Sequence, residues 1–79
     1  MTEDAIRKSL LEILAEIAPT VTVPQDQDAR SLVDLGLDSL DVSGLLLGIE
    51  DKFGLKIPDD EADHLVTLND YKAYIAERV

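Results

Sequence analysis

Apolar side chains recur every three or four residues near the start of this 79-residue chain, and this spacing places them on one face of an α-helix. Thr2 is a suitable N-cap, and Pro19 ends the helical pattern. The spacing therefore predicts a first helix between these two residues. Its core-facing positions are Ile6, Leu10, Ile13, Leu14 and Ile17.

A second helix is predicted from Ser39 to about Phe53. Asp38 is its N-cap, Asp41 completes a capping box made of two carboxylates, and Gly54 is a natural end. At about 100° per residue, one side of this helix faces a core and the other faces solvent. The core side comprises Val42, Leu45, Leu46, Ile49 and Phe53. The outer side comprises Leu40, Gly44, Leu47 and Asp51.

The remaining third of the chain predicts two more helices. The stretch "IPDDEADHL" indicates a short acidic helix from about Asp59, and Thr67 with Asp70 caps a last helix. The inward positions of that last helix are Leu68, Tyr71, Ile75 and Val79. The predicted fold class is all-α: a small four-helix bundle with a long first loop and a short third helix. A chain of this length has room for one modest core, so residues 1–79 are expected to form a single domain.

The connection from Pro19 to Asp38 is too long to be an idle link in so small a domain. Its first half includes a polar run over residues 25–30. Its second half is apolar enough to be pinned against the bundle, through one short helical turn. We therefore expect the end of this loop to be held in place. The apolar residues concerned are Leu32, Val33, Leu35 and Leu37.

The chain is strongly acidic, with 17 acids against 7 bases and a formal charge of -10. This charge repels phosphate backbones and anionic lipid surfaces, so we expect no nucleic-acid partner. We expect no membrane insertion either, because no apolar run approaches the length that spans a membrane. A soluble, cytoplasmic monomer is expected. Residues 31–51 contain five acids and neither lysine nor arginine, which favours a basic partner surface but equally fits a solvated face. These acids are Asp34, Asp38, Asp41, Glu50 and Asp51.

Ser39, in the stretch "DLGLDSLD", stands at the first position of the second helix. Free backbone N–H groups and the helix dipole favour a negative group such as a phosphate on its side chain. A nucleophilic role is disfavoured because the only histidine, His64, belongs to another segment and acids flank the serine.

A metal site is also disfavoured. Four acids near the third helix could hold calcium or magnesium only loosely, because their spacing is not that of an EF-hand loop. They are Asp59, Asp60, Glu61 and Asp63. We interpret them as a solvated helix face and predict no specific metal site.

The stretch "LGLDSLD", followed by an acidic and apolar helix and then by "IPDDEA", resembles the acyl carrier protein family over nearly the whole chain. The resemblance implies that Ser39 receives phosphopantetheine from coenzyme A through a separate phosphopantetheinyl transferase, and that Asp38 and Leu40 flank the attachment site. The chain would then be a carrier rather than an enzyme, holding an acyl group as a thioester. Its other partners would be acyl-loading and acyl-transferring enzymes with basic patches. The implied partner-binding residues are Asp38, Leu40, Asp41, Gly44, Leu47, Glu50 and Asp51.

Two positions depart from the family's usual pattern. Gly44 stands where carriers of fatty acid synthesis commonly have a glutamate, and Ser43 stands where a branched apolar residue is usual. A specialised carrier for a modified lipid, a polyketide or an amino acid is therefore an alternative to a carrier of fatty acid synthesis. An unmodified interaction domain and a small hydrolase are the alternatives from other classes.

Overall fold

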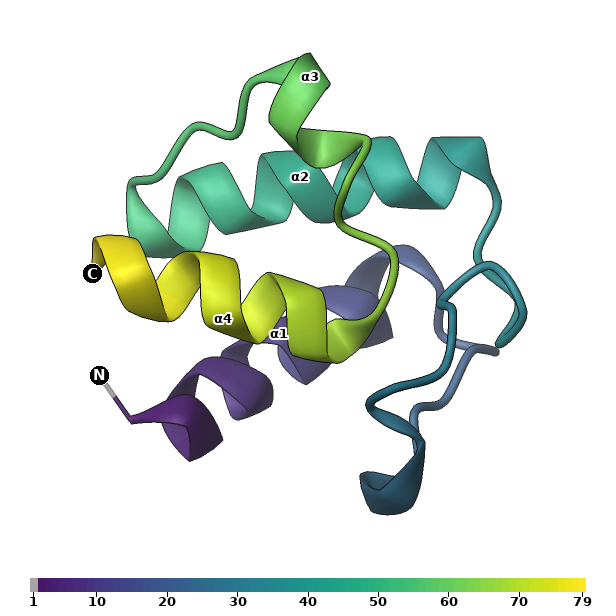
Figure 1. Cartoon of the computed structure of the whole chain (residues 1–79). Coiled ribbons are helices and arrows are strands. Elements are labelled where there is room, and N and C mark those ends of the chain that lie inside the picture. Colours follow the sequence, from purple (N-terminus) through teal and green to yellow (C-terminus); the bar gives the residue numbers. More distant parts are fainter. Residues whose placement is uncertain (1) are drawn as a thin grey trace.

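The computed structural model describes residues 2–79, which form four α-helices and one 3₁₀ turn (Figure 1). The predicted all-α four-helix bundle is confirmed. Residues 18–38, here called loop 1, separate the first two long helices, and the third helix is the shortest. The elements are α1 (Glu3–Ile17), η1 (Gln25–Gln27), α2 (Ser39–Phe53), α3 (Asp59–Ala62) and α4 (Leu68–Arg78).

Local capping sets the ends of the three long helices where the sequence predicts them. The Thr2 hydroxyl accepts a hydrogen bond from the Ala5 amide at 3.2 Å. Complete capping boxes begin α2, at Asp38 with Asp41, and α4, at Thr67 with Asp70. Gly54 ends α2 in the left-handed conformation, with φ 64°, which glycine adopts without strain.

The core lies where α1 packs against both α2 and α4. The predicted inward positions of α1 and α2 are confirmed: Leu10, Leu45 and Ile49 are fully buried, while Val42, Leu46 and Phe53 pack against the core from its edge. In α4, Leu68, Tyr71 and Ile75 are buried. Val79 is 47% exposed, so its predicted inward position is wrong; it follows Arg78, the last residue of α4.

Gly44 does not lie on the outer face of α2, and that prediction is wrong. A Cβ atom built on Gly44 would lie 3.3 Å from Ile17 Cγ2, and one built on Gly48 would overlap Ile13 Cγ2. The two glycines therefore allow α1 to approach the flank of α2 closely. The prediction divides α2 into one core side and one solvent side. It misses this contact because α1 packs against the flank between these two sides.

The end of loop 1 is held in place, as predicted. Leu32 and Leu37 are each 2% exposed, and the Leu37 amide donates to the Leu32 carbonyl at 3.1 Å. Two details differ from the prediction. The 3₁₀ turn falls in the first half of the loop, while hydrogen-bonded turns form the second half. Val33 is 63% exposed, because its turn directs it away from the bundle.

Candidate functional site

Ser39 is the first residue of α2, and its side chain is exposed. Across residues 2–79, no hydrogen bond engages its hydroxyl. Leu37, near the end of loop 1, is buried. Asp38 follows it with an extended backbone and is the N-cap of α2. The hydroxyl is thus presented to solvent by two ordered segments.

The capping box leaves two backbone donors free beside Ser39. The Asp41 amide donates to Asp38 Oδ1 at 2.9 Å, and the Asp38 amide donates to Asp41 Oδ2 at 3.2 Å. The amides of Ser39 and Leu40 have no such partner in the part of the chain that the structure describes. Free amides at the positive end of a helix dipole favour an anion, so this end of α2 suits a phosphate attached to Ser39.

The outward surface of α2 combines two apolar side chains with acids. Leu40 is 80% exposed and Leu47 is 64% exposed, which confirms their predicted placement. Asp38, Glu50 and Asp51 are also exposed, and Asp41 is partly exposed. We call these six residues the α2 face; Gly44 is excluded from it because it packs against α1.

A shallow cavity of about 330 Å³ lies beside the α2 face. Sequence reasoning missed two of its polar residues as site residues. Ser43 stands four residues after Ser39, so helical spacing could have placed both on neighbouring turns. Lys56 follows the helix end at Gly54, and nothing in the sequence pattern assigns it to this cavity. The lining comprises Ser43, Leu46, Leu47, Glu50, Lys56, Ile57 and Asp59.

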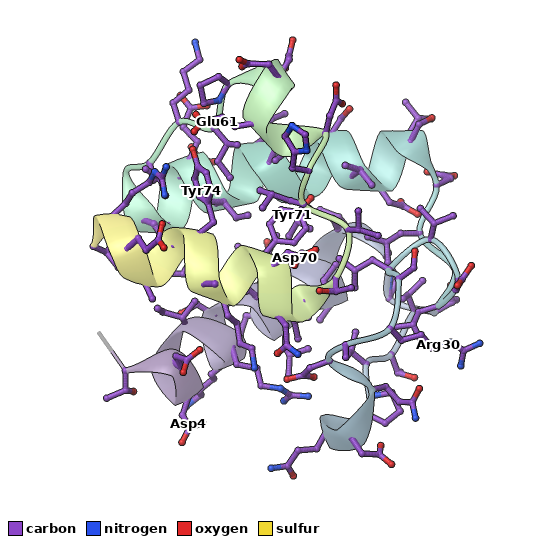
Figure 2. All side chains as sticks on the ribbon, viewed as in Figure 1. Asp4, Arg30, Glu61, Asp70, Tyr71 and Tyr74 are labelled. Atoms are coloured by element: carbon purple, nitrogen blue, oxygen red, sulfur yellow. The ribbon has the colours of Figure 1, made fainter. Side chains whose placement is uncertain are left out.

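Of the four acids in and just after α3, one is bound by other side chains. No group of three or more Asp, Glu, His or Cys side chains within residues 2–79 is arranged to hold a metal ion. Glu61 lies beside Tyr74 (Figure 2) and accepts a hydrogen bond from its hydroxyl at 3.1 Å. Glu61 also pairs with Arg78 at 3.4 Å. One of the four candidate residues therefore fastens α3 to α4.

Within residues 2–79, no helix has the length and apolar character needed to cross a membrane.

Residues 8–75 match the family model of the phosphopantetheine attachment site. The chain is also similar to the acyl carrier protein of Rickettsia typhi, with 39% identity over 77 residues that cover 98% of this chain and 90% of the relative. The acyl carrier protein of Campylobacter hominis is 38% identical over 72 residues, covering 91% of this chain and 86% of the relative.

Proposed function

Because this chain belongs to the acyl carrier protein family, we propose that Ser39 is the residue that bears its phosphopantetheine group. Members of the family are carriers with a covalently attached phosphopantetheine. The observation that supports Ser39 is its exposed, unbonded hydroxyl at the first position of α2, inside an Asp-Ser-Leu sequence. Ser43, one turn later, is exposed as well but lacks the helix end and its free amides.

The residues around Ser39 fit the group. The amides of Ser39 and Leu40 can donate to the phosphate oxygens, and the exposed Leu40 leaves the arm free to extend into solvent. The bound group supplies a thiol, on which an acyl group is carried as a thioester. Asp38 and Asp41 stay committed to the capping box, so they hold the helix end in shape.

The partners that we propose are a phosphopantetheinyl transferase and enzymes that load or transfer the acyl group. The α2 face offers them two leucines among carboxylates, which suits a basic surface with an apolar recess. The role that we propose for the chain is that of a carrier and not of a catalyst, in keeping with its family. We place this carrier in the cytoplasm as a monomer.

A specialised cargo is the second candidate, beside an acyl group of fatty acid synthesis. Gly44 no longer supports it, because the residue packs against Ile17 rather than facing a partner. The cavity beside the α2 face supports a specialised cargo, because Ser43 and Lys56 add a hydroxyl and an ammonium group to its wall. Such a wall suits an intermediate that carries polar groups.

Intact-mass measurement after incubation with coenzyme A and a broad-specificity transferase tests the attachment site. The wild type is expected to gain one phosphopantetheinyl group, Ser39→Ala none, and the matched control Ser43→Ala one. Because Ser39 is exposed, Ser39→Ala should change the free energy of unfolding by no more than about 0.5 kcal/mol. A modified Ser39→Ala protein would show that the site is elsewhere, and an unmodified wild type would favour an interaction domain.

A further inference from the structure

Asp28, in loop 1, joins three parts of the molecule through its side chain. Its two carboxylate oxygens accept hydrogen bonds from Arg7 of α1, from Nε at 2.9 Å and from Nη2 at 3.0 Å. Lys72 of α4 pairs with the same carboxylate at 2.9 Å. The three side chains are only 13 to 19% exposed. The carboxylate is thus held by two cations on two different helices.

Backbone contacts beside Asp28 strengthen this attachment. The Asp28 carbonyl accepts from the Asn69 amide at 3.0 Å, and Arg7 also donates to the Val23 carbonyl at 3.2 Å. Ser31 then forms an isolated β-bridge with Thr67. The segment that starts at Asp28 is therefore fastened to the beginning of α4.

The same attachment continues along the chain toward Ser39. The Leu32 amide donates to the Val66 carbonyl at 3.0 Å, and the Leu32 carbonyl accepts from the Leu37 amide. Asp38 and Ser39 follow directly. Before Asp28, Val23 is buried in the core, while Gln25 and Asp26 are exposed. Asp28 thus marks the start of the segment that is docked on the beginning of α4.

We propose that Asp28 is a positioning residue that keeps the end of loop 1 docked, so that residues 28–38 and Ser39 reach the transferase as one rigid surface. This inference rests on the proposed attachment at Ser39. If Asp28 loses its charge, the docked segment gains freedom that binding to the enzyme must remove. Ordering even one backbone residue corresponds to about a tenfold loss in affinity.

The kinetics of Ser39 modification test this role. For apo Asp28→Asn and a broad-specificity transferase, we expect the KM for the carrier to rise about tenfold while kcat stays within about twofold of the wild type. Ile75→Val, a core change in α4 that keeps Asp28 and both of its cations, is the control for lost stability and should leave both constants unchanged. All variants are assayed at a temperature where circular dichroism shows them folded.

Amide hydrogen exchange gives an independent readout. The Leu32 amide should exchange faster in Asp28→Asn than in the wild type, with no comparable increase in Ile75→Val. If Asp28→Asn does not fold, Lys72→Met removes one cation from the carboxylate and should change KM and exchange in the same direction.

An unchanged KM together with unchanged exchange at Leu32 would overturn the positioning role. Equal increases in KM for Asp28→Asn and Ile75→Val would also overturn it, because lost stability alone would then explain the change in KM. A wild type that the transferase does not modify would instead count against the attachment at Ser39, while the exchange experiment would still decide whether Asp28 docks the loop.

Discussion

Asp28 with Arg7 and Lys72, here called the anchor, uses an acidic residue in the opposite way to the α2 face. Asp28 is largely buried and shared by Arg7 and Lys72, whereas Glu50 and Asp51 on α2 are exposed and have no ion pair within residues 2–79. Lys52, which is also on α2, pairs with Glu12 of α1 and not with either of these acids. The chain therefore uses two of its cations to fix loop 1 and leaves Glu50 and Asp51 without an ion pair within the described residues, in keeping with the basic partner surface proposed above.

Removing the carboxylate of Asp28 should have the largest effect on stability. Asp28→Ala leaves Arg7 and Lys72 partly buried without their partner, so we expect a loss of about 3 kcal/mol in the free energy of unfolding. Asp51→Ala, on the α2 face, should change it by less than about 0.5 kcal/mol. Urea unfolding of both variants measures the difference, and equal losses would break the contrast between the two regions.

Acid should weaken the anchor more gently than deletion does. The hydrogen bond from Arg7 holds the pKa of Asp28 below its ordinary value of 3.8, and the Val66 amide does the same for Asp70. A carboxylate with a lowered folded-state pKa contributes stability above its unfolded pKa and loses it as pH falls through the folded value. The free energy of unfolding should therefore decrease as pH falls below about 4.

This loss on acidification should be shallower in Asp28→Asn, which has no proton to take up at that position. Asp51→Asn serves as the control and should follow the wild type. Thermal unfolding between about pH 5 and pH 2 measures both slopes. If the stability of Asp28→Asn falls with pH as steeply as that of the wild type, the Asp28 carboxylate does not contribute to the loss of stability in acid.

The flank of α2 that meets α1 belongs to neither region, and Gly48 tests how closely the two helices are packed there. Gly48→Ala would normally stabilise a helix, but the new Cβ would overlap Ile13 Cγ2. We expect a net loss of about 1 kcal/mol, because overpacking outweighs the gain in helix propensity. Gly44→Ala, whose Cβ contact with Ile17 is looser, should lose less. A more stable Gly48→Ala protein, measured by urea unfolding, would contradict the close packing.

Leu47 should show the smallest effect on stability and a clear effect on binding. Leu47→Ala truncates a side chain that is 64% exposed, so the free energy of unfolding should change by less than about 0.5 kcal/mol. The KM for the carrier in the transferase reaction should nevertheless rise, because an apolar contact is lost. An unaltered KM would show that the transferase does not contact Leu47.

The ends of the helices and the position of Ser39 could be predicted because they depend on neighbours in the sequence. Asp38 and Asp41 are three residues apart, as are Thr67 and Asp70, and each pair forms its capping box locally. The Asp-Ser-Leu sequence then puts Ser39 on the first turn of α2. For these features, the residue types and their spacing contain the whole interaction.

The sequence by itself therefore determined the all-α class, the helix starts, the exposed Leu40 and Leu47, and the candidate attachment residue. Only the tertiary structure decided that Asp28 pairs with Arg7 across 21 residues and with Lys72 across 44. It also decided that Gly44 packs against Ile17. The physical reason is range: a cap or a helix face repeats within one or two turns, whereas ion pairs and close helix contacts depend on how distant segments dock.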